Sequence, residues 1–186
     1  RPFCPGADLK ADRHDDERLQ EAWFDVPLLL HEMPQVTIAA VNGACAGAGL
    51  GFALACDLRY AARTARLNTA FLDVAVAGDM GVPWTLPRLV GAGRARELSM
   101  LPRKLTADEA QAIGMVNEVF DDDRLLDEVT DRARRLAAAS PRARNALKEH
   151  YVLAERTGFA EFLALESSRH MSIASSADTQ EAFRAF

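Results

Sequence analysis

Two short segments of small residues each stand just before sequence that favours a helix. The first is Cys4-Pro5-Gly6-Ala7, and the second is Gly47-Ala48-Gly49. The N-terminus of a helix presents unpaired N–H groups and about half a positive charge, and small residues let a ligand approach these groups. Together the two segments could therefore hold an oxygen atom that becomes negatively charged during a reaction.

Each segment also has a simpler interpretation. The stretch from Gly47 to Gly49 equally suits a helix packed closely against a strand, and Gly6-Ala7 equally suits an ordinary turn. The residues alone leave both interpretations open, because neither spacing is specific to a binding site.

Side chains that could bind a metal or act as nucleophiles are few. The cysteines form no Cys-x-x-Cys pair, so we expect reduced thiols. The histidines lack the spacing of metal ligands, so we interpret each as structural and expect no metal. These residues are Cys4, Cys45, Cys56, His14, His31, His150 and His170.

The elements that must position the two segments follow from hydrophobic periodicity and turn residues. Residues 34–44 are rich in β-branched side chains and reach a turn at Asn42-Gly43, which predicts a buried strand. A helix is expected from Gly47. Residues 66–91 predict a strand, a loop and a short helix, because glycines and prolines interrupt any longer element.

The rest of the chain has apolar residues at helical spacing. Thr106 and Glu109 have the spacing of a capping box, at the start of a helix that Gly114 would end. A strand would come next, and helices would follow to the C-terminus. Pro141 is placed to begin one of these helices and Gly158 to end it.

Composition narrows the class of protein. The chain has 186 residues, 49% of them hydrophobic, and a formal net charge of −5, which predicts one compact soluble domain and does not favour a nucleic-acid partner. No apolar run reaches the roughly 18 residues of a membrane span and no signal peptide is recognised, so we expect a cytoplasmic protein. The chain starts at Arg1 without a methionine and stops within helix-forming sequence, so we expect it to be part of a longer polypeptide.

Four motifs together resemble those of the enoyl-CoA hydratase/isomerase, or crotonase, superfamily, in their order and spacing. They are FCPGADLK, PQVTIAAVNGACAGAGLGFALACDLRYAA, GDMGVPWTLPRLVGAGRARELSM and LTADEAQAIGMVNEVF. The resemblance implies an α/β fold, a ClpP/crotonase spiral of repeated ββα units, over residues 1–135, with N-terminal strands of the spiral absent. Residues 136–186 would form a C-terminal helical region that trimerises.

The resemblance also implies a substrate class, the acyl thioesters of coenzyme A, with coenzyme A as part of the substrate and no separate cofactor. The thioester carbonyl would accept the main-chain N–H groups of Ala7 and Ala48. The first segment would contact coenzyme A, through Cys4, Gly6, Asp8 and Lys10. For the side chains of Asp8 and Lys10, a solvated charge pair is the favoured role. The implied assembly is a homotrimer or a dimer of trimers.

The carboxylates depart from the pattern that the resemblance implies for a hydratase. Hydratases of the family place one glutamate on the helix after the second segment and another on the following loop, where this chain has Gly51 and Phe71. Neither side chain can transfer a proton, and Phe71 would make that side of the pocket apolar. Asp79 lies where other branches, including enoyl- and dienoyl-CoA isomerases, carry a working aspartate. We therefore expect Asp79 to be the base; otherwise it would cap the short helix that follows.

Three functions remain open. The first is double-bond isomerisation by Asp79, with Ala7 and Ala48 as the oxyanion hole. The second is hydration of a 2-enoyl-CoA, with water activated by Asp79 and another group. The third is binding of acyl-CoA without catalysis, since both glutamate positions are lost. Trp84 could line the acyl pocket or belong to the core.

Overall fold

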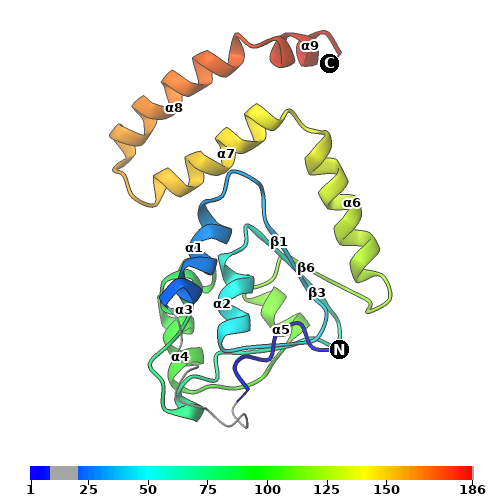
Figure 1. Cartoon of the computed structure of the whole chain (residues 1–186), viewed down its shortest axis with the longest axis vertical. Coiled ribbons are helices and arrows are strands. Elements are labelled where there is room, and N and C mark those ends of the chain that lie inside the picture. Colours follow the sequence, from blue (N-terminus) through cyan, green and yellow to red (C-terminus); the bar gives the residue numbers. More distant parts are fainter. Residues whose placement is uncertain (9–20, 186) are drawn as a thin grey trace. The chain divides into compact units, whose positions relative to one another are not determined.

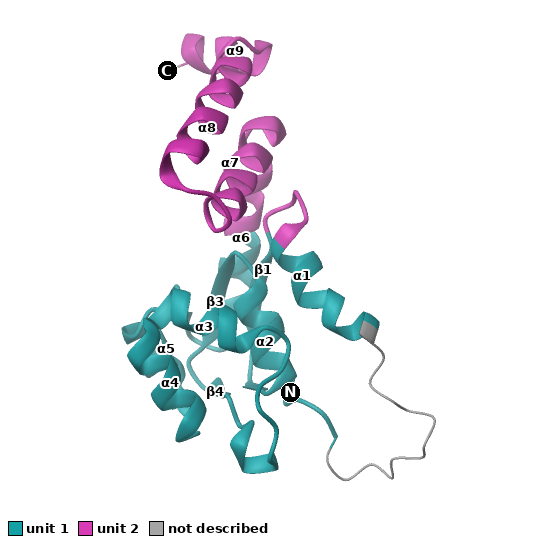
Figure 2. Cartoon of the chain, turned by 90° about the vertical axis from the view of Figure 1, so that its left-hand side faces the viewer, with its two compact units in different colours: residues 1–31, 37–131 teal, residues 32–36, 132–186 magenta. Residues whose placement is uncertain are grey.

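The computed structural model describes residues 1–8 and 21–185 of the chain. They belong to two compact units, shown in Figure 2: residues 1–31 with 37–131, and residues 32–36 with 132–186. The predicted domain boundary after residue 135 stays a prediction.

The first unit contains two three-stranded sheets (Figure 1). Their strands are β1 (Ile38–Val41), β2 (Ala44–Ala46), β3 (Leu58–Ala62), β4 (Arg66–Asn68), β5 (Leu105–Thr106) and β6 (Glu118–Phe120). One sheet has the order β1-β3-β6 with all strands parallel. The other has the order β2-β4-β5, in which β2 is parallel and β5 antiparallel to β4. The register places Cys45 of β2 opposite Leu67 of β4.

Short helices connect these strands. They are the 3-10 turns η1 (Glu21–Phe24) and η2 (Leu72–Val74) and the helices α1 (Asp25–Glu32), α2 (Ala48–Ala55), α3 (Val82–Val90), α4 (Ala92–Met100) and α5 (Ala107–Ala112). The predicted strand before Asn42, the helix after Gly47 and the strand, loop and short helix of residues 66–91 are confirmed. Six of the eight residues of α2 are buried, as expected for a helix that is apolar on every side.

The core of the first unit lies around α2. Val41, Cys45, Leu50, Leu67 and Leu86 are fully buried and belong to one hydrophobic cluster. Burying a side chain of this size contributes about 1.5–3 kcal/mol relative to leaving it exposed. Helices α2 and α3 therefore pack against one core, and the candidate site lies at the starts of these two helices.

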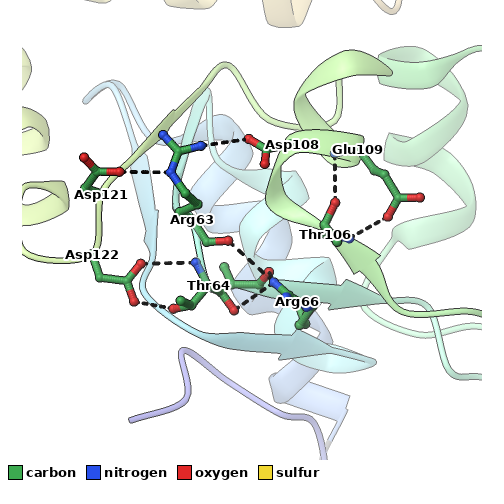
Figure 3. A network of polar contacts seen from close by, with 9 residues as sticks. Arg63, Thr64, Arg66, Thr106, Asp108, Glu109, Asp121 and Asp122 are labelled. Atoms are coloured by element: carbon green, nitrogen blue, oxygen red, sulfur yellow. Dashed lines mark hydrogen bonds and ion pairs between the residues drawn. The ribbon is translucent and has the colours of Figure 1, made fainter.

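Polar contacts join the turn between β3 and β4 to the segment after β6 and to the first turn of α5 (Figure 3). Arg63 forms ion pairs with Asp108 at 3.2 Å and with Asp121 at 2.9 Å, and both main-chain and side-chain groups of Thr64 donate to Asp122. Hydrogen bonds from Thr64 lower the pKa of Asp122. Because these side chains are exposed, their ion pairs contribute little stability and mainly fix the path of the turns.

The predicted capping box is confirmed. The Thr106 hydroxyl accepts the Glu109 N–H at 3.1 Å, and the Glu109 carboxylate accepts the Thr106 N–H at 2.8 Å (Figure 3). The hydrogen bond from the Thr106 N–H and another from Arg103 lower the pKa of Glu109. Helix α5 therefore begins at the residue that the sequence indicates.

The second unit is helical, as predicted for the C-terminal third. Its helices are α6 (Leu125–Ala138), which begins in the first unit, α7 (Pro141–Ala154), α8 (Phe159–Ala174) and α9 (Ala177–Ala185). Ser140 caps the N-terminus of α7 and Pro141 is its first residue. The prediction that Gly158 ends this helix is wrong. Gly158 is extended, with φ −74°, and is the N-cap of α8. Helix α7 already ends at Ala154, with Glu155 as its C-cap, and the Thr157 hydroxyl and N–H both donate to the Leu153 carbonyl.

In the part of the chain that the structure describes, no helix combines the length and the apolar character needed to cross a bilayer. No three His, Cys, Asp or Glu side chains of those residues meet as metal ligands. The three cysteines are present as free thiols.

Candidate active site

The two Gly-Ala pairs lie side by side. A β-carbon added to Gly6 would lie 3.1 Å from the Ala46 carbonyl oxygen and 3.9 Å from the Gly47 Cα. Gly6 has φ +96° and Gly47 has φ +54°, values that side chains strongly disfavour. Ala7 and Ala48 follow these two glycines, so their N–H groups come to neighbouring stretches of main chain.

A parallel bridge explains why the pairs meet. Cys4 and Cys45 are bridge partners, and each lies two residues before the glycine of its pair. The Cys4 N–H donates to the Ala44 carbonyl at 3.1 Å, and the Ala46 N–H donates to the Cys4 carbonyl at 3.0 Å. The first segment therefore continues the sheet beside β2, and the same register carries Gly6 to Gly47.

Gly49 has a packing role. A β-carbon there would lie 2.1 Å from the Cys4 carbonyl oxygen and 2.6 Å from the Cys4 Cβ. The simpler interpretation of the small-residue segment, close packing of a helix, therefore holds for Gly49. Gly47 is required for a different reason, because its positive φ turns the chain from β2 into α2.

The start of α2 is suited to bind a negatively charged oxygen. Ala48 is the first residue of the helix, so its N–H has no partner within the helix, and the N-cap residue Gly47 has no side chain to supply one. Among the described residues, no main-chain carbonyl accepts the N–H of Ala7 or of Ala48. Ala48 is half-buried and Ala7 is exposed, which leaves both amides at the edge of the fold. The helix dipole adds positive potential at the same point.

Asp79 lies on a tight loop between η2 and α3. Its side-chain Oδ1 accepts the N–H of Met80 at 2.8 Å, and its carbonyl accepts the N–H of Val82 at 3.0 Å. The N-cap of α3 is Gly81, and no side chain caps that helix. The alternative that the Asp79 side chain caps α3 is therefore wrong, because its Oδ1 accepts the N–H of Met80, which precedes the N-cap residue Gly81.

The Asp79 loop rests on the same helix that begins with Ala48. A β-carbon on Gly51, three residues further along α2, would lie 2.4 Å from the Met80 Cβ and 2.8 Å from the Met80 carbonyl oxygen. The loop that carries Asp79 therefore contacts α2 three residues after Ala48, the residue whose N–H is one of the two predicted donors.

Of the four residues predicted to contact coenzyme A, the structure describes Cys4, Gly6 and Asp8. Both main-chain groups of Cys4 are engaged with β2, so its thiol is the part left for a ligand. Gly6 is half-buried against Ala46 and Asp8 is exposed. Lys10 lies outside the described residues, and so does any charge pair that it forms with Asp8.

The thiol below the second segment is inert. Burial raises the pKa of Cys45 to about 12, and the neighbouring Cys4 adds to the rise. At neutral pH the Cys45 thiol is therefore protonated, and it serves as a small core side chain rather than as a nucleophile.

The family model for enoyl-CoA hydratase/isomerase matches residues 1–186 of the chain. The chain belongs to the enoyl-CoA hydratase/isomerase family. The resemblance predicted from the four motifs is thereby confirmed.

Relatives named for different activities are similarly close to this chain. The chain is 35% identical to the 1,2-epoxyphenylacetyl-CoA isomerase of Escherichia coli over 195 residues, which covers all of this chain and 74% of the isomerase. It is 34% identical over 190 residues to a probable enoyl-CoA hydratase of Rhodobacter capsulatus, again covering all of the chain and 74% of the relative. The family thus does not choose between isomerisation and hydration.

Solved structures show the crotonase fold. The crystal structure of an enoyl-CoA hydratase from Bacillus anthracis superposes with a TM-score of 0.85 at 30% identity, covering 88% of this chain and 64% of that one. The predicted α/β crotonase fold is confirmed. The chain spans about three quarters of the length of these curated relatives and 64% of that solved structure.

Gly51 and Phe71, the two positions at which the resemblance implies the glutamates of a hydratase, are packed against other groups. Gly51 faces the main chain of Met80. Phe71 is only 5% exposed and belongs to the main hydrophobic cluster, while its carbonyl accepts the N–H groups of Val74 and Val76. Its side chain therefore stabilises the core beneath η2.

Two features were not found from the sequence. Met80 has φ +47°, which no residue type signals in advance; only the neighbouring glycines, Gly78 and Gly81, mark an unusual loop. Trp84 is 42% exposed, so it does not belong to the core. Its ring forms a T-shaped pair with His31, with 5.4 Å between the ring centroids, and its centroid lies 3.7 Å from the Arg88 guanidinium carbon.

Proposed function

We propose that this chain carries the active site of an enzyme that isomerises a carbon–carbon double bond in an acyl-CoA thioester. One observation carries the proposal. The main chains of Gly6 and Gly47 are in contact, with Ala7 and Ala48 directly after them, and among the described residues no main-chain carbonyl accepts either alanine N–H. Two such donors can share the charge of one oxygen.

The reaction needs one carboxylate and no co-reactant. The Asp79 carboxylate removes a proton from one carbon of the acyl chain, and the electron pair moves onto the thioester oxygen, which the amides of Ala7 and Ala48 hold. The protonated Asp79 then returns the proton to a different carbon as the enolate collapses. Losing one such amide donor costs about 3 kcal/mol of transition-state stabilisation.

The packing of Gly51 and Phe71 favours isomerisation over hydration. Hydration by two glutamates requires both carboxylates to bind one water molecule. In this chain Met80 fills the space beside Gly51, and Phe71 is part of the hydrophobic core. A pocket without that water favours returning the proton over adding a hydroxyl group.

Incubating the full-length protein with 2-enoyl-, 3-enoyl- and dienoyl-CoA thioesters in heavy water tests the proposal. Mass spectrometry would follow products and deuterium uptake at the α-carbon, and a fluorescent acyl-CoA analogue would report binding. We expect isomerised product or deuterium uptake that is lost in Asp79→Asn while binding is retained. Unchanged exchange in Asp79→Asn would contradict the role of Asp79.

Hydration is the second candidate, supported by the probable hydratase among the relatives. Only one oxygen of the Asp79 carboxylate has a partner among the described residues, so the other could orient a water. A hydrated product in the same assay would favour this candidate. Tight binding with neither product nor exchange would favour an acyl-CoA-binding protein without catalysis.

Further features of the family belong to the same proposal. Cys4, Gly6, Asp8 and Lys10 would contact coenzyme A, which enters as part of the substrate. A homotrimer or a dimer of trimers is proposed for the assembly, and light scattering on the full-length protein would measure it. A cytoplasmic location stays a prediction.

A further inference from the structure

The loop that carries Asp79 packs against α2 at Gly51, where there is no room for a side chain. A β-carbon on Gly51 would lie 2.4 Å from the Met80 Cβ, 2.8 Å from its carbonyl oxygen and 3.3 Å from its carbonyl carbon. Two of these three atoms belong to main chain, which cannot swing aside as a flexible side chain can. Met80 is only 4% exposed, so the contact is fully formed.

Met80 holds an unfavourable backbone conformation at this contact. Its φ is +47°, in the left-handed region where a side chain is sterically disfavoured, and Gly81 after it has φ +74°. Such a conformation persists only where the surrounding structure imposes it, and it is often found at functional sites. Here the imposing surface is Gly51 of α2.

The same residue orients the carboxylate. The Met80 N–H donates to Asp79 Oδ1 at 2.8 Å, so the direction of that N–H decides where the Asp79 side chain points. On its far side the loop is held by α3, because the Gly81 carbonyl accepts from the Thr85 N–H at 3.0 Å and from the Thr85 hydroxyl at 3.1 Å. Rotating the Met80 peptide would therefore turn the carboxylate.

We propose that Met80 is a positioning residue for Asp79 and that Gly51 is the surface on which it is seated. The inference rests on the proposed role of Asp79 as the proton-transferring group. Gly51 is then a required glycine in this chain, and restoring a glutamate there would displace the loop before it could activate a water.

Two matched pairs of variants test this. Leucine and isoleucine contain the same atoms, but the branched β-carbon of isoleucine makes φ near +50° far less accessible. Met80→Leu should keep the α-exchange rate within about threefold, because it conserves volume. Met80→Ile should lower the rate about 100-fold at unchanged thioester Kd, as expected for a displacement of about 1 Å at a reacting group.

The second pair compares glycines in helices. Gly51→Ala should lower the exchange rate in the same way, whereas Gly93→Ala in α4 should not, since a β-carbon on Gly93 would meet nothing within 4 Å. Should Gly51→Ala fail to fold, the Leu and Ile variants of Met80 carry the test. Exchange rates in Met80→Ile and Gly51→Ala equal to those of their controls would overturn the proposal.

A readout independent of activity separates this inference from the proposed function. With ¹⁵N-methionine, the chain shows only five labelled amides, and the Met80 signal is assigned by its disappearance in Met80→Leu. We expect this signal to shift in Asp79→Ala and in Gly51→Ala but to stay in place in Gly93→Ala. A fixed Met80 signal in Gly51→Ala would overturn the positioning inference even if the enzyme is active. If the Met80 signal shifts in Gly51→Ala but the parent protein shows no α-carbon exchange, the contact between Gly51 and Met80 is supported and the proposed reaction is refuted.

Discussion

Cys4 and Cys45 are partners in a parallel bridge, and each lies two residues before the glycine of a Gly-Ala pair. This one register explains the candidate oxyanion hole, because equal steps along two parallel strands reach neighbouring points. The chain thus repeats one short pattern, Cys-x-Gly-Ala, on two adjacent segments.

Replacing Gly49 by alanine should destabilise the fold. The added β-carbon would lie 2.1 Å from the Cys4 carbonyl oxygen, so either the first segment or α2 must move. Overpacking of this kind typically costs about 1–3 kcal/mol. Urea unfolding would measure the loss, with Gly93→Ala as the control. Equal stability of the two variants would show that the first segment is not held against α2.

The glycines of the two Gly-Ala pairs should respond unequally to alanine. Both have positive φ, so each substitution carries a backbone cost of about 1–3 kcal/mol. A β-carbon on Gly6 would also press on the Ala46 carbonyl oxygen at 3.1 Å, whereas one on Gly47 would have its closest contact at 3.9 Å. Gly6→Ala should therefore be the less stable variant in thermal unfolding. The reverse order would contradict the contact between Gly6 and β2.

The buried Cys45 thiol should make the fold sensitive to alkali. Its pKa is raised from 9.0 to about 12 by burial and by Cys4, so the unfolded chain ionises first as the pH rises. The contribution is complete below pH 9 and declines from pH 9 to 12 by up to about 1.4 kcal/mol per pH unit. The difference in unfolding free energy between the parent and Cys45→Ala should narrow over this range.

Alkylation checks the burial of Cys45 independently of the stability measurement. Iodoacetamide should also leave Cys45 unmodified in the folded protein at pH 8, because neither exposure nor ionisation favours attack. Rapid alkylation of Cys45 under native conditions would contradict its burial.

Removing the capping box should weaken α5. Thr106→Ala deletes the hydroxyl that accepts the Glu109 N–H, which costs about 1 kcal/mol. Hydrogen bonds lower the pKa of Glu109, so its contribution is complete above the ordinary glutamate pKa of 4.5 and is lost as the pH falls below it. The acid limb of the stability curve should therefore be shallower in Glu109→Gln. An unchanged acid limb would show that the carboxylate does not hold the Thr106 N–H in solution.

Features that depend on a few neighbouring residues were predictable from the sequence. The Thr106 and Glu109 capping box, the helix start at Pro141 and the turn at Asn42-Gly43 all formed as expected. Each of them satisfies local hydrogen bonds or backbone preferences within a few residues. The family motifs could be recognised for a related reason, since small residues at fixed spacing reflect main-chain demands.

Other outcomes were not predictable from the residue types alone. The prediction that Gly158 ends α7 is wrong, because α7 ends at Ala154 and Gly158 is the N-cap of α8. The sequence left open whether Trp84 belongs to the core, and the structure shows its side chain exposed. The role of Asp79 as a helix cap was excluded only once its hydrogen bond to Met80 was known.

The sequence by itself determined the family, the local starts of helices and the residue types that a main-chain oxyanion hole requires. Only the tertiary structure decided that Gly6 meets Gly47 and that Gly51 seats Met80. Those contacts join residues far apart in the chain, so they form when the sheet register and the packing of α2 bring the segments together. The left-handed conformation of Met80 follows from that packing, because the contact with Gly51, 29 residues away in the sequence, offsets the free-energy cost of its positive φ.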